Sequence, residues 1–327
     1  MSDVAIIGAG VMGLATAHAL ARAGRDVVVY ERFEQGHARG SSHGRSRIVR
    51  LAYAEPEWVR LAQEAFAGWR ELERETGERL LELNGLVEIV TDLAASSAST
   101  LDACGVPWER LDRDEAARRF PLRIPPGWFG VLQPEAGIVR ADRALAAFAQ
   151  GIDVRYGARV SSLSNVDADC VVVTAGAWIN ELIEPPLPVR VTRETVCYFR
   201  PADARAIPAF VSFGPRSGGI FFYALADPVH GIKAAVHHGG VEVDPNEPGL
   251  PDAKLVQAIT AWVAELVPLA DPQPVEVQTC LYTSTVDESF VLERRGRVVV
   301  GSACSGHGFK FAPAIGARLA ALAMEVS

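Results

Sequence analysis

Three short stretches of this chain carry side chains whose types and spacing suggest chemistry. GRSRIVR places Arg47 and Arg50 three residues apart, TCLYT places Cys280 two residues before Tyr282, and SGHGFKF contains Lys310. An arginine fork binds a carboxylate with two hydrogen bonds, and a lysine adds a point charge. Taken alone, each stretch also has an ordinary explanation. A buried cysteine is usually a small apolar residue, and RSRIVR by itself is typical of a solvated basic turn.

The elements that must position these groups begin with a glycine-rich turn near the start of the chain. Val4 to Ile7 predict a strand buried on both faces, followed by G-x-G-x-x-G at Gly8, Gly10 and Gly13. The first glycine permits a tight turn and the second lets a pyrophosphate approach the backbone. The third lets a helix pack closely on the strand.

The residues that follow complete the dinucleotide-binding pattern. A helix is expected over Leu14 to Arg22, with its amino terminus directed at a diphosphate, and a second strand over Val27 to Tyr30. Glu31, at the end of that strand, stands where an acidic side chain accepts hydrogen bonds from an adenosine ribose. A chance glycine-rich turn would not bring these elements into register. The pattern alone does not separate NAD from FAD.

Later segments favour FAD. A third buried strand, Cys170 to Val173, precedes the small-residue turn Thr174-Ala175-Gly176-Ala177-Trp178, although an ordinary strand–helix turn would look similar. A fourth strand, RVVVG, leads through a glycine loop to a closing helix with Pro313 near its start. A dinucleotide fold assembled from the beginning, middle and end of a chain is common in FAD enzymes and unusual in simple NAD enzymes.

Composition excludes several classes of protein. The chain has 327 residues, 49% of them hydrophobic, and a net charge of −8 without a dense basic block, so we expect no nucleic-acid partner. The glycines in the apolar amino-terminal run exclude a membrane span, and no signal peptide precedes it. Five cysteines without C-x-x-C spacing predict neither disulfides nor a metal site, and they fit a reducing cytoplasm: Cys104, Cys170, Cys197, Cys280 and Cys304.

With these segments identified, the chain resembles the monomeric sarcosine oxidase and N-methyltryptophan oxidase family of flavoenzymes, within the D-amino acid oxidase superfamily. Four motifs carry the resemblance: GSSHGRSRIVRLAYAEPEWVRLA, FYALADPVHGIKAAVHHGG, CLYTSTVDESFVLE and CSGHGFKFAPAIG. Aligning the second motif requires a one-residue deletion, and the chain is shorter than typical members. The resemblance implies an α/β protein, α+β overall, with a Rossmann-like FAD-binding domain and a second, mixed-sheet substrate domain.

The resemblance also implies how the cofactor is held. The cysteine of the C-x-Y-T motif carries FAD as an 8α-S-cysteinyl thioether in that family, and Cys280 occupies this position. The residues expected to bind the cofactor are Gly8, Gly10, Val11, Met12, Gly13, Glu31, Arg32, Ser41, Ser42, His43, Arg47, Ile48, Val160, Thr174, Ala175, Gly176, Trp178, Cys280, Gly306, His307, Gly308, Phe309 and Lys310.

The implied reaction is oxidation of a secondary amine beside a carboxylate. A hydride equivalent passes to the flavin, the imine hydrolyses, and oxygen is reduced to hydrogen peroxide. By resemblance, Arg50 and Lys310 pair with the carboxylate, and Arg47 packs on the opposite flavin face. By the same resemblance, Lys233 is the fixed cation that stabilises the superoxide formed when oxygen is reduced. Without the family, Lys233 would be read as a strand lysine pointing to solvent.

Three further residues match the lining of the amine pocket, where aromatic faces favour a partly cationic amine: Tyr223, His237 and Tyr282. His237 alone could equally be a satisfied core histidine, and His238 beside it is expected to be exposed. The final helix is expected to point its amino terminus at the pyrimidine ring of the flavin, where the helix dipole adds to the charge of Lys310.

The expected FAD-binding domain is discontinuous, over residues 1–80, 138–184 and 285–327, with the substrate domain over 81–137 and 185–284. LNGLVEIV, RVTRETVCYF and GGIFFYAL predict strands of the substrate domain. Helices are expected after Pro56, with an apolar stripe through Trp58, Phe66 and Trp69, and over residues 251–267.

The leading interpretation is thus a cytoplasmic, monomeric oxidase whose partners are a small-molecule amino acid and O2. Sarcosine, N-methyltryptophan, proline and pipecolate all remain possible substrates. One alternative is a FAD-dependent amino acid dehydrogenase, or a glycine-oxidase-like enzyme with a non-covalent flavin. A flavin-bearing scaffold without turnover is a third reading, against which Arg50, Lys233 and Lys310 together argue.

Overall fold

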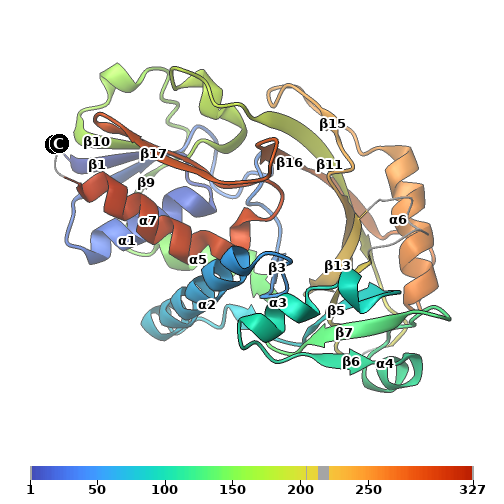
Figure 1. The fold of residues 1–327 in the computed structure, drawn as a ribbon. Coiled ribbons are helices and arrows are strands. Elements are labelled where there is room, and N and C mark those ends of the chain that lie inside the picture. Colours follow the sequence, from blue (N-terminus) through green and yellow to red (C-terminus); the bar gives the residue numbers. More distant parts are fainter. Residues whose placement is uncertain (1, 204, 213–220, 326–327) are drawn as a thin grey trace.

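Two large β-sheets, joined by a small one, organise the chain. The structure is a computed structural model that describes residues 2–203, 205–212 and 221–325. In Figure 1 the sheet that includes β1 and β10 lies on the left with helices beneath it, and a long curved sheet lies on the right. The α/β class, with a Rossmann-like sheet and a second mixed sheet, is as expected from the sequence.

The first sheet has six strands in the order β17-β18-β10-β1-β2-β9, all parallel except β17. Its central strands are rich in valine and isoleucine and are buried on both faces, as parallel strands covered on both sides must be. The strands are β1 (Ser2–Ile7), β2 (Val27–Tyr30), β9 (Asp153–Arg155), β10 (Ala168–Val173), β17 (Val291–Arg295) and β18 (Val298–Ser302).

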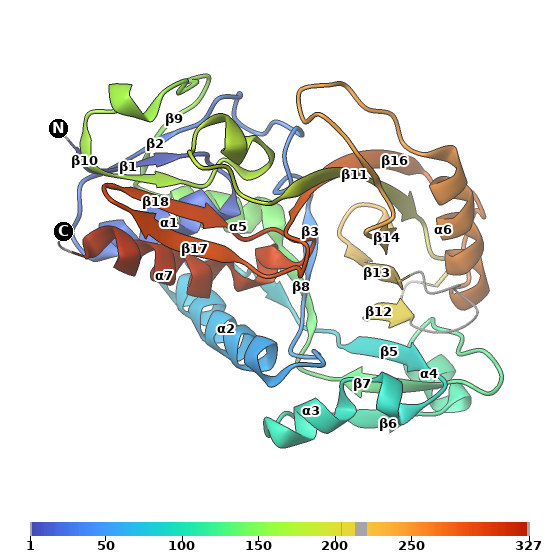
Figure 2. The same cartoon turned by 45° about the horizontal axis from the view of Figure 1, so that its top comes forward.

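Helices cover one face of this sheet. Gly316, in the last helix α7 (Ala312–Met324), lies against the backbone of Ala15 in the first helix α1 (Val11–Arg22). These two helices therefore pack with almost no side chain between them. Figure 2 shows the long helix that follows Pro56 lying beneath them. Its buried stripe contains Ala62, Phe66 and Trp69, as the periodicity predicts. The helices are α1 (Val11–Arg22), α2 (Pro56–Thr76), α5 (Ala141–Ala149) and α7 (Ala312–Met324).

The second sheet has nine strands in the order β15-β11-β14-β13-β12-β5-β7-β6, with β16 paired to β11. It is mixed, because β12 and β5 are parallel while the other pairs are antiparallel. The strands are β5 (Leu86–Val90), β6 (Glu109–Leu111), β7 (Phe129–Gln133), β11 (Arg190–Phe199), β12 (Ala209–Ser212), β13 (Phe221–Asp227), β14 (Gly231–His237), β15 (Val241–Glu242) and β16 (Glu276–Ser284).

The two faces of this sheet have different roles. Phe222, Ala234 and Val236 point toward helix α6 (Ala253–Leu266) and form one apolar core. Their neighbours in the strands, including Tyr223 and Lys233, point the other way, because successive side chains alternate across a strand. That second face looks toward the six-stranded sheet.

Smaller elements connect the two sheets. A three-stranded sheet, in the order β3-β8-β4, joins β3 (Ser46–Val49), β8 (Gly137–Arg140) and β4 (Leu81–Glu82). Further helices among the described residues are α3 (Ala98–Ala103), α4 (Arg113–Arg119) and the short 3₁₀ helices η1 (Leu93–Ala95), η2 (Leu163–Asn165), η3 (Gly176–Glu181) and η5 (Gly308–Phe311).

Several expected boundaries were wrong. Helix α1 begins at Val11 rather than Leu14, because extended Gly10 caps it and the hydroxyl of Ser42 accepts the N–H of Val11 at 3.0 Å. Strand β10 begins at Ala168, two residues before Cys170. In LNGLVEIV only Leu86–Val90 is strand, since Gly85 has a left-handed φ of 93°. The first three residues of GGIFFYAL lie outside the described residues.

Candidate active site

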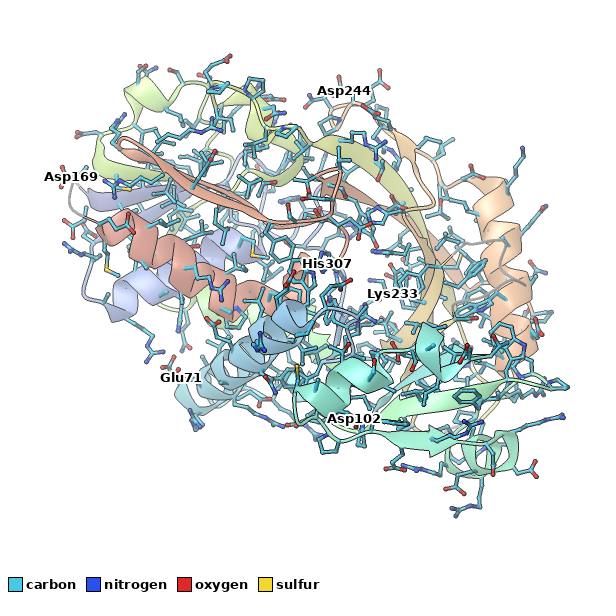
Figure 3. All side chains as sticks on the ribbon, viewed as in Figure 1. Glu71, Asp102, Asp169, Lys233, Asp244 and His307 are labelled. Carbon is cyan, nitrogen blue, oxygen red and sulfur yellow. The ribbon has the colours of Figure 1, made fainter. Side chains whose placement is uncertain are left out.

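A cavity of about 760 Å³ lies between the two large sheets. In Figure 3 Lys233 and His307, which both line it, lie near each other in the middle of the view, between the two sheets. Every residue expected to bind the cofactor or the substrate lines this cavity, with the single exception of Gly13. Residues from 7–50, 142–182, 221–237 and 278–310, together with Val211, therefore converge on one place.

The glycine-rich turn forms one end of the cavity. Gly8 has a φ of 106°, and a Cβ at this position would lie 2.6 Å from the carbonyl oxygen of Thr174. Gly13 faces away from the cavity and lies against Gly8 and Thr174, so its role is to let α1 approach the sheet. The first turn of α1, whose backbone N–H groups have no partner within the helix, lines the cavity at Val11 and Met12, and Ser42 accepts the N–H of Val11. This end therefore offers a site for an anionic phosphate group.

Glu31 stands at the carboxyl end of β2, as expected. Its carboxylate accepts the backbone N–H groups of Ala9 (2.9 Å) and Phe33 (3.0 Å), and its side chain is buried at the cavity wall. Beyond it, the guanidinium of Arg32 lies 5.1 Å from the ring centre of Trp178. An acidic group between aromatic and cationic side chains suits a nucleoside, which offers ribose hydroxyls and a flat base.

The turn after β10 closes the same end. The hydroxyl of Thr174 lies 3.3 Å from the carbonyl oxygen of Ile7 and 3.2 Å from that of Gly8, and it ties β10 to the glycine turn. Gly176 has a φ of 56°, which lets the chain turn sharply into η3. The small residues predicted here thus bring backbone, rather than side chains, against the cavity.

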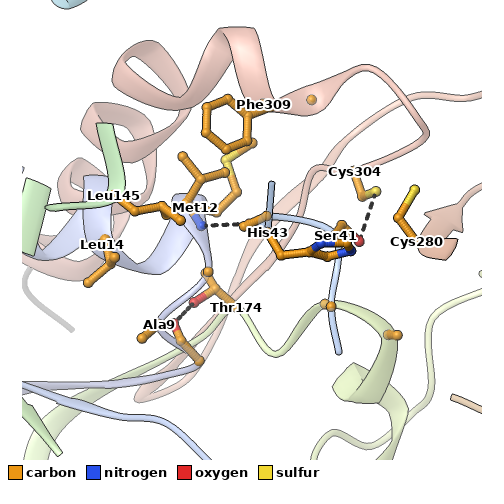
Figure 4. A pocket seen from close by; sticks show the side chains of 18 of the residues that line it. Ala9, Met12, Leu14, Ser41, His43, Leu145, Thr174, Cys280, Cys304 and Phe309 are labelled. Carbon is orange, nitrogen blue, oxygen red and sulfur yellow. Dashed lines mark hydrogen bonds between the residues drawn. The ribbon is translucent and has the colours of Figure 1, made fainter. Parts of the chain in front are cut away.

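Residues from distant segments meet around Cys280. Figure 4 shows Ser41, His43, Cys280 and Cys304 together at the cavity wall. The hydroxyl of Ser41 donates to the carbonyl oxygen of Leu281, and the thiol of Cys304 lies 3.7 Å from that hydroxyl. Burial raises the pKa of Cys280 to about 11, and the charges of Arg47 and Lys233 oppose this rise.

Arg47 is held rigidly by backbone oxygens. Its guanidinium donates to the carbonyls of Ser41, His43 and Ser46. Its central carbon also lies 5.4 Å from the ring centre of Phe309. A cation fixed in this way keeps its position whether or not a ligand is bound.

Arg50 and Lys310 approach the same aromatic ring. The Arg50 guanidinium lies 4.5 Å from the ring centre of Tyr53, and the ammonium of Lys310 lies 5.6 Å from it. Lys310 donates to the carbonyl oxygen of His307 at 2.6 Å. Burial, and then the charge of Arg50, hold the pKa of Lys310 well below its usual value. Two neighbouring cations with reduced hydration form a binding site for an anion.

Lys233 is buried at the cavity wall rather than pointing to solvent. Its ammonium donates to the carbonyl oxygen of Ser46 at 3.3 Å. Burial lowers its pKa to about 7, with a further decrease from Arg47 and opposing effects from Cys280 and Asp227. The residue is therefore poised to be charged or neutral near physiological pH.

Three aromatic side chains form a second part of the cavity wall, near the cationic pair. The hydroxyl oxygens of Tyr223 and Tyr282 lie 3.3 Å apart, and the ring of His237 meets both tyrosines edge-on. Burial raises the pKa of both tyrosines. Burial, followed by the charge of His238, lowers the pKa of His237 well below 6.5. At neutral pH this wall is therefore uncharged.

Some residues at the site were not predicted. Tyr53 lies within a motif that pointed to the family, but nothing in the sequence marked its ring as the contact of two cations. Gln278 lines the cavity and accepts the hydroxyl of Tyr198 at 3.0 Å. The alternation Gln278, Cys280, Tyr282 along β16 was the available signal. His238 is exposed, as expected, and its ring nitrogen Nε2 lies 3.2 Å from the carboxylate of Glu288.

The residues present fit FAD. The glycines leave a cradle that a Cβ would fill, an acidic residue faces the ribose position, and α1 begins at the phosphate position. Two buried ring nitrogens at the cavity wall, Nε2 of His43 and Nδ1 of His307, have no hydrogen-bond partner among the described residues. These nitrogens are available to a polar group inside the cavity.

Comparison with known proteins agrees with this geometry. The sequence matches the profile of the FAD dependent oxidoreductase (DAO) family over residues 3–322, and the chain belongs to that family. It is therefore a FAD-dependent oxidoreductase. Within the described residues, no helix combines the length and the apolar character needed to cross a membrane.

Individual relatives cover nearly the whole chain. It is 32% identical to the peroxisomal sarcosine oxidase of Homo sapiens, over 99% of this chain and 93% of that protein. It is 28% identical to the monomeric sarcosine oxidase of a Bacillus species, over 98% and 92%. Among solved structures, the open form of NikD, an unusual amino acid oxidase of nikkomycin biosynthesis, superposes with a TM-score of 0.87. That match has 28% identity and covers 99% of this chain and 94% of NikD.

Proposed function

We propose that this enzyme oxidises secondary amino acids, with sarcosine and other N-methyl amino acids as its substrate class. The observation that carries the proposal is the pairing of Arg50 and Lys310 on Tyr53, in the same cavity as an uncharged wall of His237, Tyr223 and Tyr282. A carboxylate on the cations directs the neighbouring amine toward the aromatic wall. The names of the sarcosine oxidase relatives support the same class.

With O2 as the electron acceptor, the electrons and protons released by oxidation of the amine are all accounted for. The carbon next to nitrogen loses a hydride and the nitrogen loses a proton, which gives an imine. Water hydrolyses the imine to a carbonyl compound and a free amine, and O2 takes up the two electrons and two protons as hydrogen peroxide. FAD supplies the two-electron acceptor that links the halves of this reaction.

The carboxylate grip provides both affinity and orientation. Arg50 offers a planar fork and Lys310 a point charge, and both are held in advance by Tyr53 and by the carbonyl oxygen of His307. Fixing one end of a small substrate places its other end reproducibly, which lowers the entropic part of the barrier. Loss of either cation should weaken substrate binding and slow flavin reduction together.

The aromatic wall selects the state of the amine. His237, Tyr223 and Tyr282 carry no negative charge at neutral pH, so they do not stabilise a full ammonium ion as a carboxylate would. The amine must lose its proton before its carbon can give up a hydride. A polar but uncharged pocket beside two cations favours that loss.

We also propose that the flavin is attached to Cys280. The thiol lies at the cavity wall beside Arg47 and Lys233, whose charges favour the thiolate that attachment requires. The other residues expected to hold FAD, apart from Gly13, line the same cavity. Lys233, buried and close to Cys280, would supply a fixed positive charge where oxygen is reduced.

The arrangement of the sheets supports the proposed domain division. Strands of the six-stranded sheet fall within residues 1–80, 138–184 and 285–327, while those of the nine-stranded sheet fall within 81–137 and 185–284. We further propose a monomer, in line with the name of the Bacillus relative, and a cytoplasmic location.

The test is peroxide production with a panel of amines. Sarcosine, N-methyltryptophan, proline and pipecolate should be compared with glycine and with N-methylamines that lack a carboxylate. We expect turnover only where a secondary amine stands beside a carboxylate, and a large loss in Arg50→Gln. Bleaching of the flavin without peroxide would indicate a dehydrogenase instead. No bleaching by any member of the panel would refute the proposal.

A further inference from the structure

A cluster of three side chains of the kinds that bind metal ions lies beside the amine pocket. One ring nitrogen from each of His237 and His238 and a carboxylate oxygen of Glu288 all lie within 4.8 Å of one another. Nε2 of His238 is 3.2 Å from Oε1 of Glu288. In a tetrahedral zinc site with bonds of about 2.1 Å, ligand atoms lie about 3.4 Å apart. The described residues contain no other such group of three.

The backbone brings the two imidazoles to the same side. Successive side chains of a strand normally point to opposite faces. His238 follows the last residue of β14 and has a φ of 54°, so the alternation ends there. As a result, the ring centres of His237 and His238 lie only 4.2 Å apart.

Glu288, like His238, has a backbone with a positive φ. Its φ is 59°, and its carbonyl oxygen lies 3.2 Å from Nε2 of His307. Only three non-glycine residues among those described have a positive φ, and His238 and Glu288 are two of them. Such backbone positions persist when the surroundings enforce them, and they gather at functional sites.

The ring of His237 is fixed from the cavity side. The ring of His237 packs against Gly306, where a Cβ would lie 2.6 Å from the ring, and against Tyr282. Glu194, which is fully buried, accepts the N–H of Gly240 at 2.9 Å and so fastens the turn that follows His238. Glu194 and Glu288 both interact electrostatically with His238, which offsets the positive charges of Arg50 and Lys310 near His237.

We propose that His237, His238 and Glu288 form a binding site for a divalent metal ion such as Zn²⁺, and that a metal ion bound there inhibits amine oxidation. Two imidazoles and one carboxylate are ligands that Zn²⁺ prefers, and they leave a fourth position open. Because His237 also lines the amine pocket, a metal on its ring occupies space that the substrate amine needs. The inhibitory part rests on the proposed function, whereas metal binding itself does not.

Calorimetric titration of the untagged holoprotein with zinc chloride tests the binding. We expect a single site with an affinity in the micromolar range. His238→Asn, which keeps a residue that tolerates positive φ, and Glu288→Gln should each weaken it at least about tenfold. His230→Asn is the matched control, because His230 pairs with Glu276 at 2.7 Å outside any such cluster. Equal affinity in all four proteins, or no saturable binding, would overturn the proposal.

X-ray absorption of the zinc-loaded wild type identifies the ligands without any variant. Nitrogen and oxygen neighbours at about 2.0–2.1 Å support the site, while sulfur at about 2.3 Å would move the metal to a cysteine and overturn it. In steady-state assays zinc should raise KM for the amine with kcat unchanged, and a chelator should reverse this. Zinc binding that depends on His238 and Glu288 in an enzyme that oxidises no amine would uphold the site and refute the proposed function.

Discussion

The indole N–H of Trp69 donates to the backbone carbonyl oxygen of Lys310 at 2.7 Å, although the two residues are 241 positions apart. Trp69 is fully buried in α2, and Lys310 lies in η5 at the cavity wall. This hydrogen bond connects the long helix that packs beneath the first sheet to one of the two cations expected to hold the substrate. The position of Lys310 thus depends on a residue outside the cavity.

Replacing Trp69 with phenylalanine leaves that carbonyl oxygen buried without its donor. We expect a loss of about 1–3 kcal/mol in the free energy of unfolding, together with a higher KM for the carboxylated substrate. Chemical denaturation and steady-state kinetics measure the two effects. Trp108→Phe is the control, because its indole donates to Asp102 at the exposed surface, away from the cavity. An unchanged KM in Trp69→Phe would separate this hydrogen bond from substrate binding.

The reaction of the reduced enzyme with oxygen should depend on pH through Lys233. Since its pKa is lowered to about 7, the ammonium is charged below pH 7 and loses its charge above it. If the charge assists oxygen reduction, the rate constant for flavin reoxidation is level below pH 7 and falls as pH rises. Stopped-flow mixing of reduced enzyme with oxygen measures this directly.

Two substitutions sharpen that prediction. Lys233→Met should lower the reoxidation rate at least about a hundredfold, while flavin reduction by substrate changes much less. Lys233→Arg keeps its charge at all these pH values, so the decline above pH 7 should disappear. Lys254→Met, in a solvent-facing turn of α6, is the control. Equal losses in both half-reactions would argue for a structural role.

The attachment of the flavin can be read from the mass of the protein. If the cofactor is linked to Cys280, the intact mass rises by one FAD and acid precipitation carries the yellow colour into the pellet. In Cys280→Ser both signals should vanish. Cys304→Ser, whose thiol lies at the same cavity wall beside Ser41, should keep both. Colour in the supernatant of the wild type would contradict the linkage and favour the glycine-oxidase-like alternative.

The glycine turn should tolerate no side chain at Gly8. With a φ of 106° and a Cβ that would lie 2.6 Å from the carbonyl oxygen of Thr174, Gly8→Ala combines an unfavourable backbone with a clash. We expect little bound flavin and a markedly lower melting temperature. Gly24→Ala isolates the backbone effect of about 1 kcal/mol, because Gly24 has a φ of 77° but open space around it. Similar behaviour of the two variants would show that strain alone, rather than contact with Thr174, is responsible.

Local sequence patterns predicted the fold well. Valine-rich strands and a glycine turn identified β1, β2 and β10, and the spacing of apolar residues identified α2. The boundary of α1 was missed because its cap is supplied by Ser42, which is 31 residues away in the chain. Local sequence does not reveal a partner that folding brings in from a distance.

The candidate site was predicted to a similar extent. Arg50, Cys280 and Lys310 were identified through motifs, and they line one cavity. The rings that orient them, above all Tyr53, and the turn that brings His237 and His238 together could not be predicted. Those contacts depend on backbone angles and on neighbours in other elements, which side-chain types alone do not specify.

The close contact of α1 with α7, where Gly316 rests on Ala15, has a consequence for biosynthesis. During translation the glycine turn emerges first, but β18 and α7, which complete its sheet and cover its helix, are made about 300 residues later. A nascent chain without them exposes the apolar face of α1 and lacks the wall formed by residues 301–310. We therefore expect the cofactor to be taken up only after α7 has been made, and the partly made chain to expose an apolar surface that favours aggregation until then.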